Sequence, residues 1–277
     1  MALFKIFNKR KKPKIKRTVK KRVKVKKTVK IRRPEKIHIK PKVKKVVKPN
    51  KVKIPAPVSK KVEVKTTINK MPEEKAYELL KRYRIKIPEY AFCSNEKSLV
   101  EAVKRIGFPC VLKVSGKGII HKTEVNGVRV NIRTLEEAVK TFNELMKIKG
   151  CEKVIIQKMI TEGYEIIIGG KKDPQFNKVI ALGAGGIFTE FLKDVSFRVS
   201  PLSREDAEDM LNEVKFSDLL LKGFRGQKPA NKEAIINTIL AVSNIMERDS
   251  KIKEIDINPL FANYENAFAV DVRIILE

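Results

Sequence analysis

The sequence predicts an α+β protein of two lobes, preceded by a long basic segment that does not fold. Three observations support this prediction. From about residue 70 onward, helical and strand periodicities mix without the regular strand–helix–strand repeat of a parallel sheet. The last stretch, Ile255 to Leu276, has the pattern of a β-hairpin. Residues 1–69 are rich in Lys and lack the apolar content that a core requires.

The positive charge is concentrated in this N-terminal segment. The chain has 277 residues and a formal net charge of +30. Of its 62 Lys and Arg, 28 precede Lys70, where only Glu35 and Glu63 are acidic. The rest of the chain has a net charge of about +4, an ordinary value for a globular domain. The total charge therefore describes residues 1–69 and not the folded part.

Residues 1–69 are expected to be a disordered Lys-rich tail. Lys and Val alternate from Val19 to Ile31 and prolines recur, so little apolar surface can be buried to offset the conformational entropy. Three roles stay open. The tail is a solvated segment, a non-specific contact with nucleic acid phosphates, or an attachment to an anionic membrane surface. The last role rests on Leu3, Phe4 and Phe7 ahead of the polybasic run.

The cysteine content and the hydropathy predict a cytoplasmic protein. Cys93, Cys110 and Cys151 are far apart, and no pair has the spacing of a zinc site. No apolar run reaches the roughly 18 residues of a membrane-spanning helix. The N-terminus also lacks the apolar region of a signal peptide. We therefore expect a reducing environment inside the cell.

The first elements after the basic segment are helices. Apolar residues at helical spacing begin after Pro72 and end near Pro88. A second helix is expected at Lys97 to Ile106, with Ser94 as its N-terminal cap. Two strands and a helix then follow, at 111–114, at 127–132 and from Thr134.

The second half is expected to contain three strands, two capped helices and the closing hairpin. The strands are predicted at 154–159, 164–168 and 178–182. Ser203 and Asn231 are preferred N-cap residues, and each precedes a helical pattern. The helix after Asn231 has a continuous apolar face, which indicates that it packs against a sheet.

The closing hairpin groups four polar side chains. If its turn is centred on Tyr264-Glu265, Asn258 lies opposite Asp271, and Asp256 lies opposite Arg273. All four share one face, because side chains alternate along a strand. A carboxylate and an amide oxygen opposed across two strands suit a hard cation such as Mg²⁺. A salt-bridged sheet face is the alternative that the same geometry allows.

Three further features have both a chemical and a structural explanation. Lys113 interrupts an apolar strand, where a lysine either extends to solvent or faces an anion. The glycine-rich run 183–188 marks a close approach of the backbone to another group, or a tight turn. His121 is the only histidine of the expected folded part, and its loop also carries Lys117 and Lys122. A lone histidine is more often structural than catalytic, so both roles stay open.

Many motifs follow one another in a characteristic order. They are FPCVLKV at 108–114, IIHKTEVNGV at 119–128, VIIQKM at 154–159, GYEIIIGGKKDPQF at 163–176, GAGGIFTE at 183–190, KDVSFRVSPL at 193–202, LKGFRG at 221–226, EIDINPL at 254–260 and AVDVRI at 269–274. In this order they resemble the ATP-grasp unit, often a separate β subunit, of ADP-forming acetyl-CoA and acyl-CoA synthetases. They are more distantly similar to the β subunit of succinyl-CoA synthetase. The resemblance covers residues from about Pro72 to Glu277.

The resemblance implies an ATP-grasp fold at 70–277, with the nucleotide between two α+β lobes. It also implies roles at matching positions. Lys113 would contact the ATP phosphates, and Glu165 would reach the ribose. The adenine end would be lined by Gln157, Lys158 and Met159. Asn258 and Asp271 would hold Mg²⁺, in agreement with the hairpin geometry, and His121 would take phosphate transiently as a phosphohistidine.

The implied reaction is acyl-CoA + ADP + phosphate ⇌ carboxylic acid + CoA + ATP, of which this unit handles the nucleotide half. The chain contains no Rossmann G-x-G-x-x-G motif to bind CoA. The resemblance therefore implies a partner α subunit that carries the CoA-binding and ligase domains and its own phosphohistidine.

Four positions depart from the family pattern, and none is an implied ligand. Glycine is usual where this chain has Asn126 and Arg84. Arginine is usual in place of Lys172, and aspartate in place of Asn231. The alternative to an enzyme subunit is a non-catalytic ATP-grasp module, used for binding or regulation, with a polyanion-binding tail. The presence of the implied ligands and of His121 favours the enzyme.

Overall fold

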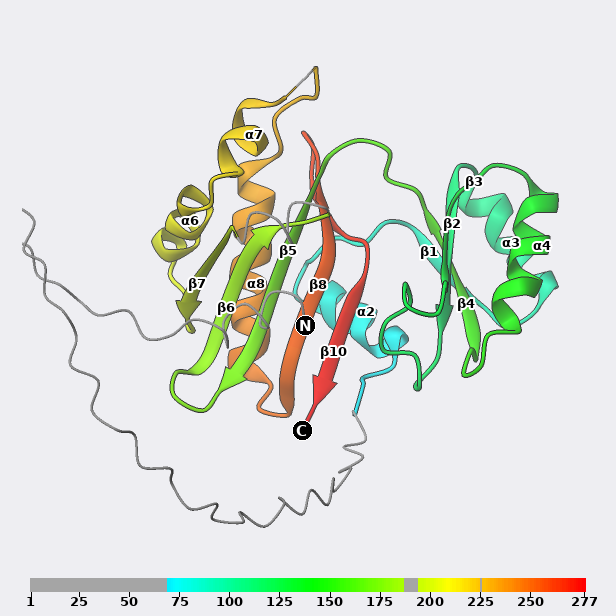
Figure 1. Ribbon diagram of the computed structural model, residues 1–277, viewed down its shortest axis with the longest axis horizontal. Coiled ribbons are helices and arrows are strands. Elements are labelled where there is room, and N and C mark those ends of the chain that lie inside the picture. The colour runs from blue at the N-terminus through cyan, green and yellow to red at the C-terminus, as the bar shows by residue number, and fades with distance from the viewer. Residues whose placement is uncertain (1–68, 187–193, 225) are drawn as a thin grey trace, which may run out of the picture. The chain divides into compact units, whose positions relative to one another are not determined.

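The computed structural model describes residues 69–186, 194–224 and 226–277, which form two antiparallel sheets with separate cores (Figure 1). Residues up to Ile68 lie outside the described part. The predictions that the basic tail is disordered and that it binds a partner concern these residues. The last two residues of the glycine-rich run, 187 and 188, also lie outside the described part. In the described ranges no helix is both long enough and apolar enough to cross a membrane.

The smaller sheet has four strands in the order β1-β4-β2-β3. Their bounds are Tyr90–Cys93 for β1, Cys110–Ser115 for β2, Val128–Ile132 for β3 and Lys153–Lys158 for β4. Helices α3 (Glu96–Ile106) and α4 (Leu135–Met146) cover one face of this sheet (Figure 1). Apolar side chains of both helices, such as Leu99 and Leu145, are buried against the strands. This packing leaves the opposite face of the sheet for other contacts.

The larger sheet has the order β10-β8-β5-β6-β7, and β9 pairs with β8. The bounds of its strands are Tyr164–Asp173 for β5, Asn177–Ala184 for β6, Val195–Val199 for β7, Ile252–Ala262 for β8, Ala267–Ala269 for β9 and Val272–Leu276 for β10. The helices of this part are α2 (Glu73–Arg82), α6 (Arg204–Glu213), α7 (Ser217–Lys222) and α8 (Lys232–Arg248).

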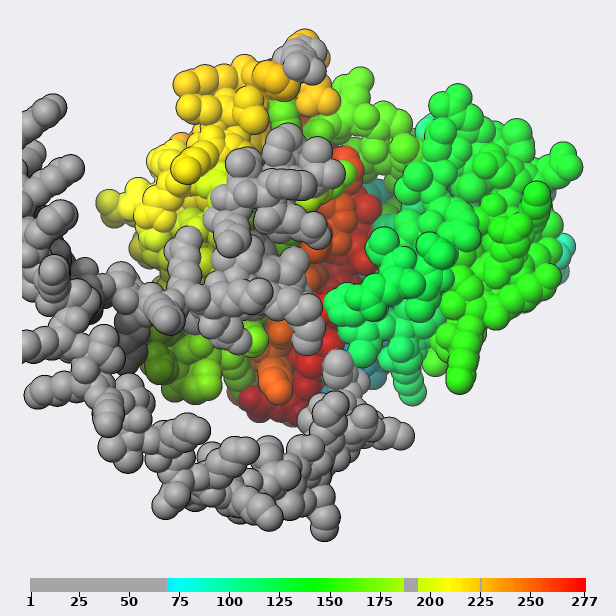
Figure 2. Space-filling view, in the orientation of Figure 1, coloured from blue at the N-terminus to red at the C-terminus, as the bar shows by residue number. Residues whose placement is uncertain are grey.

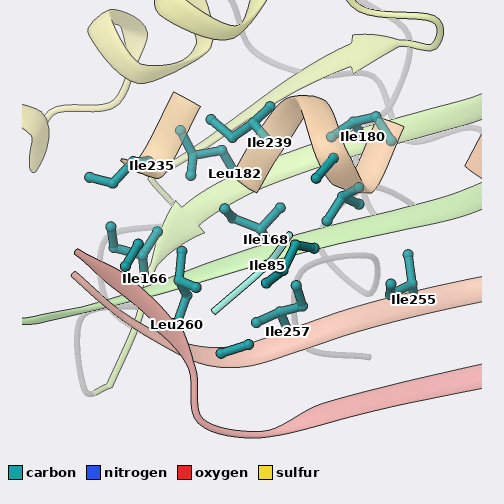
Figure 3. Close-up of a cluster of buried hydrophobic side chains, with 14 of the residues drawn as sticks. Ile85, Ile166, Ile168, Ile180, Leu182, Ile235, Ile239, Ile255, Ile257 and Leu260 are labelled. Atoms are coloured by element: carbon teal, nitrogen blue, oxygen red, sulfur yellow. The ribbon is translucent and has the colours of Figure 1, made fainter. Parts of the chain in front are cut away.

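The core of the larger part is rich in isoleucine and leucine. Side chains of β5, β6 and β8 meet Ile235 and Ile239 of α8, and Ile85 enters the same cluster after α2 (Figure 3). Ile235 and Ile239 are one helical turn apart, so both face the sheet. Burial of each such side chain contributes about 1.5–3 kcal/mol to stability, and the core fixes the strands that carry the candidate ligands.

Most of the expected elements are confirmed. Thr134, Ser203 and Asn231 cap their helices through side-chain oxygens that accept backbone hydrogen bonds. The predicted cap Ser94 is wrong, because Asn95 accepts from the Ser98 N–H and completes a capping box with it. Three short elements were not expected from the periodicity, namely β1, β7 and α7. At four to six residues, they are too short for a periodic pattern to develop.

The predicted pairing of the closing hairpin is confirmed. Arg273 lies opposite Asp256, and the Asn258 N–H donates to the Asp271 carbonyl at 3.0 Å. The returning chain is split into β9 and β10, which both pair with β8. The hairpin therefore brings the side chains of 258 and 271 to neighbouring positions.

Two departures from the family pattern adopt left-handed backbone. The φ angles of Arg84 and Asn126 are 59° and 50°. This region is favoured by glycine, which is the usual residue of the family at both positions. Asparagine tolerates it better than arginine, because its short polar side chain can compensate locally. The backbone at both positions thus has a conformation that glycine adopts readily.

Candidate functional site

Lys113 lies at the centre of β2 and points away from the core of the smaller sheet. Its neighbours Leu112 and Val114 are buried under the helices, so alternation along the strand directs Lys113 to the opposite face. The side chain is only 3% exposed. Its Nζ donates to Gln157 Oε1 at 2.6 Å and to the Val270 carbonyl at 2.7 Å. Lys113 therefore does not extend to solvent; it joins the two sheets as a buried cation.

Burial changes the acid–base behaviour of this lysine. Removal from water disfavours the ammonium and lowers the pKa of Lys113 to about 8, although Asp271 acts in the opposite direction. Two polar atoms nearby are buried and have no hydrogen-bond partner among the described residues: Gln157 Nε2 and the Tyr77 hydroxyl. A buried donor without a partner costs free energy, so this region has unused capacity for a polar ligand.

A cavity of about 310 Å³ is lined by three of the expected site residues, His121, Asn258 and Asp271. Asp256 and Arg273, the other pair of the hairpin, line it as well. The Asn258 side chain is exposed and that of Asp271 is 30% exposed, so both offer oxygen atoms to the cavity. No group of three or more His, Cys, Asp or Glu suited to a metal is found in the described ranges. The site thus offers a carboxylate–amide pair.

Asp271 belongs to a network that we call the lysine cluster, made of Lys70, Glu73, Lys122 and Asp271. Lys122 Nζ lies 2.7 Å from Asp271 Oδ1 and 3.5 Å from Glu73 Oε1. Lys70 Nζ lies 2.5 Å from the same Glu73 oxygen. The Ser115 hydroxyl donates to Glu73 Oε2 at 3.0 Å. The loop between β2 and β3 (green) meets the end of the chain (red) on the face that Figure 2 shows.

The cluster shifts the pKa values of its members. Burial acts to raise the pKa of the Asp271 carboxyl, but Lys122 and Lys113 outweigh it and hold this pKa below its ordinary value. Burial likewise acts against the Lys122 ammonium, yet Asp271 and Glu73 raise the pKa of Lys122. Asp271 is therefore ionised at neutral pH, as a metal ligand must be.

A second network, which we call the arginine cluster, consists of Arg273, Glu254, Asp256 and His121. Arg273 Nη2 donates to Glu254 Oε1 at 2.9 Å and to Asp256 Oδ2 at 3.2 Å. Arg273 Nη1 lies 3.2 Å from His121 Nε2. A guanidinium has no acceptor, so the imidazole must accept this bond through Nε2 and carry its proton on Nδ1. Burial and Arg273 both lower the pKa of His121, which favours the neutral ring.

The residues expected at the adenine and ribose end lie elsewhere. Met159 lines a cavity of about 620 Å³. Glu165 lines another of about 500 Å³, which shares Gly163 and Gln227 with the first. Lys158 is exposed, whereas Gln157 is fully buried and faces Lys113. The structure thus brings Lys113 and Gln157 together, and His121 with Asn258 and Asp271, but distributes the remaining residues over separate cavities.

The glycine-rich run has a structural explanation at Gly185. Its N–H donates to the Glu165 carbonyl at 2.8 Å. A Cβ atom there would lie 2.6 Å from the Glu165 carbonyl carbon, closer than packing permits. The close approach expected from the sequence is therefore to the backbone of β5, at a residue that lines a cavity.

Sequence reasoning did not identify Lys70, Glu73 or Tyr77 as site residues. Glu73 lies in the first turn of α2, where an acidic residue ordinarily complements the helix dipole. Lys70 reaches the site because it forms a β-bridge with Ile275 beside β10. Lys122 was noted only as a charge near His121. The available signal was the proximity of Lys70 and Glu73, three residues apart at a helix start.

Comparisons with known proteins agree on one family. Residues 64–276 match the model of the ATP-grasp domain. The chain is 44% identical over 211 residues to the β subunit of ADP-forming acetate–CoA ligase I of Pyrococcus furiosus, covering 74% of this chain and 90% of that protein. It is 42% identical over 204 residues to ADP-forming acetate–CoA ligase II of Archaeoglobus fulgidus, of which it spans 30%.

Solved structures give the same result. The chain resembles an acetyl-coenzyme A synthetase 1 of Ca. Korarchaeum cryptofilum in complex with coenzyme A and Ca-AMPCP, with a TM-score of 0.72 and 37% identity. The match covers 76% of this chain and 94% of that one. A second structure of that enzyme, with Mg-AMPPCP and a phosphohistidine segment pointing towards the nucleotide site, matches with a TM-score of 0.64 and 38% identity over 75% and 92% of the two chains.

Proposed function

Because the chain belongs to the ATP-grasp family and, within it, to the β subunits of ADP-forming acetate–CoA ligases, we propose that it performs the nucleotide half of an acid–CoA ligase reaction. The overall reaction is acyl-CoA + ADP + phosphate ⇌ carboxylic acid + CoA + ATP. Residues 70–277 are the catalytic unit in this proposal, and residues 1–69 lie outside it. The observation that carries the proposal is the cavity shared by His121, Asn258 and Asp271, beside the buried Lys113.

The nucleotide contacts follow from the buried polar groups. Lys113 is the cation for the phosphates, held in place by Gln157 and by the Val270 carbonyl. Gln157 Nε2 and the Tyr77 hydroxyl are buried polar groups in the same region, and a phosphate or ribose oxygen that entered there would find donors. The cavities lined by Met159 and Glu165 would take the adenine and the ribose, and Lys158 would border the adenine.

The carboxylate–amide pair fits Mg²⁺. Asn258 and Asp271 present oxygen atoms from adjacent strand positions, which suits a cation that takes few protein ligands and keeps its waters and phosphates. The related structure described with Mg-AMPPCP supports this choice. When bound, the ion supplies charge neutralisation on the phosphate oxygens.

His121 is the phosphoryl acceptor in this proposal. Its neutral ring carries a lone pair on Nε2, directed at Arg273. In the direction of ATP cleavage, Nε2 forms a bond to the γ-phosphorus, the bond from that phosphorus to the bridging oxygen breaks, and ADP leaves. Arg273, freed from Nε2, then faces the phosphoryl oxygens. Such a covalent intermediate divides the transfer into two steps.

The CoA half requires a partner in this proposal. The Pyrococcus relative is named as a subunit, and the Archaeoglobus relative is a longer single chain of which this protein spans 30%. We expect an α subunit with CoA-binding and ligase domains and its own phosphohistidine, which exchanges a phosphoryl group with His121.

Labelling of the full chain with γ-³²P-ATP and Mg²⁺ tests the proposal. We expect acid-labile, base-stable label on the wild type, none on His121→Asn, and undiminished label on the control His38→Asn, which alters the only other histidine. Calorimetry of the same variants with Mg·ADP reports binding separately. Nucleotide binding without label on His121 would identify the chain as a non-catalytic ATP-grasp module and overturn the proposed transfer.

A further inference from the structure

Lys122 forms a close ion pair with Asp271, the candidate metal ligand. Its Nζ lies 2.7 Å from Asp271 Oδ1, and its side chain is only 5% exposed. The other nearby cation, Lys113, directs its ammonium to Gln157 and to the Val270 carbonyl instead. Lys122 is thus the group that neutralises the Asp271 carboxylate, for which a metal ion would compete.

A lysine ammonium and a divalent cation compete for such an oxygen. Two positive charges a few ångströms apart repel each other strongly where little water screens them. We therefore expect metal binding at the Asp271 carboxylate to move Lys122 away from it. A buried ammonium that leaves its partner is costly unless another anion receives it.

Glu73 is that second acceptor. Its Oε1 lies 3.5 Å from Lys122 Nζ, and its side chain is 3% exposed. Lys70 and the Ser115 hydroxyl hold the two Glu73 oxygens in place, so the carboxylate is fixed before Lys122 moves. A small change of the terminal torsions of Lys122 exchanges the two partners.

We infer that Lys122 is the counter-cation with which a metal ion would compete for Asp271, and that Glu73 is a positioning residue which receives Lys122 when metal binds. This inference rests on the proposed function, because it takes Asp271 as a metal ligand. After the exchange, the ammonium is paired with Glu73, and the Asp271 carboxylate is available to the metal.

The test measures binding of Mn²⁺ alone to the full chain, through the loss of the electron paramagnetic resonance signal of the free ion. Lys122→Met removes the competing cation and should tighten Mn²⁺ binding about tenfold, a usual coupling for contacting charges. The control Lys122→Arg keeps the charge and should bind no more tightly than the wild type. Glu73→Gln removes the receiving anion and should weaken binding about threefold.

A double-mutant cycle separates positioning from general structural effects. In the Lys122→Met background, Glu73→Gln should leave the Mn²⁺ affinity within about twofold, because no ammonium remains to be received. Thermal unfolding checks that each variant is folded. If Glu73→Gln does not fold, the comparison of Lys122→Met with Lys122→Arg still tests whether Lys122 competes with the metal ion.

Asp271→Asn distinguishes failure of this inference from failure of the metal assignment. If Asp271→Asn abolishes Mn²⁺ binding but Lys122→Met does not tighten it, the metal site stands and the role of Lys122 is refuted. An equal effect of Glu73→Gln in both backgrounds refutes the role of Glu73. If Asp271→Asn binds Mn²⁺ like the wild type, both the proposed metal site and this inference are refuted.

Discussion

The lysine cluster and the arginine cluster meet near the end of the chain, at Asp271, which directly precedes β10, and at Arg273 within β10, but they are built differently. In the arginine cluster one planar guanidinium contacts Glu254 and Asp256, both on the adjacent strand β8. The lysine cluster gathers residues from the start of α2, from a loop and from the end of the chain. Each of its contacts is a single ammonium–oxygen pair.

This difference indicates that the two clusters have different structural roles. A guanidinium has a rigid fork of donors, so one arginine can hold two carboxylates and an imidazole in fixed positions. An ammonium on a flexible stem can exchange one carboxylate for another at little cost. The arginine cluster is therefore suited to hold His121, whereas the lysine cluster is suited to rearrange when ligands bind.

The largest expected effect is on stability and falls on the arginine cluster. Arg273→Met removes the cation that Glu254 and Asp256 share, and the side chains of these two acids are only 9% and 13% exposed. Loss of one partner of a buried ion pair costs about 3–5 kcal/mol in the free energy of unfolding. Urea unfolding of the full chain at pH 7 measures this cost.

Lys122→Met is the matched variant in the lysine cluster. Its partner Asp271 is 30% exposed and has Lys113 nearby, so we expect a smaller loss, of about 1–2 kcal/mol. Equal losses for Arg273→Met and Lys122→Met would contradict the distinction between a holding and a rearranging cluster.

The next effect concerns nucleotide affinity. Lys113→Met removes a buried cation that lies next to the lysine cluster, and it should weaken binding of Mg·ADP about tenfold to a hundredfold. The matched control is Lys117→Met, which alters an exposed lysine of the same loop region and should change the affinity less than about twofold. Calorimetric titration of the full chain gives both dissociation constants. Similar losses for the two variants would indicate a diffuse electrostatic contribution and not a phosphate ligand.

One contact of the arginine cluster, between Asp256 and Arg273, was accessible from the sequence. Hairpin symmetry about Tyr264-Glu265 gave the opposition of Asp256 to Arg273 and of Asn258 to Asp271, because strand pairing converts sequence spacing directly into spatial position. The same regularity made the helix caps at Thr134, Ser203 and Asn231 predictable. In these segments local chemistry alone determines the structure.

The lysine cluster was not accessible in this way. Lys122 lies in the loop between β2 and β3, Asp271 directly precedes β10 and is 149 positions away, and no periodicity relates them. Glu73 satisfies an ordinary helix rule, so its burial gave no sequence signal. Likewise, the apolar strand around Lys113 allowed two orientations, and only the contact with Val270 decides between them. Contacts that depend on how two sheets pack require the tertiary structure.

The smallest expected effect concerns the pKa of His121. It tests whether charges of the arginine cluster shift this pKa while charges of the lysine cluster do not. Burial and Arg273 lower this pKa from the ordinary value of 6.5, while Glu124 and Asp256 act to raise it. Asp256→Asn should therefore lower the pKa of His121 slightly further. Glu73→Gln, in the lysine cluster, should leave it unchanged.

Proton NMR of the imidazole resonances measures this pKa directly, because the chain has only two histidines and His38→Asn assigns them. The neutral ring is the phosphoryl acceptor, so phosphorylation should be complete above the pKa of His121 and decline as the pH falls through it. A lowered pKa extends that plateau below pH 6.5. A shift of the His121 titration in Glu73→Gln as large as that in Asp256→Asn would show that the clusters act on His121 as one network, and the difference in their structural roles would not hold.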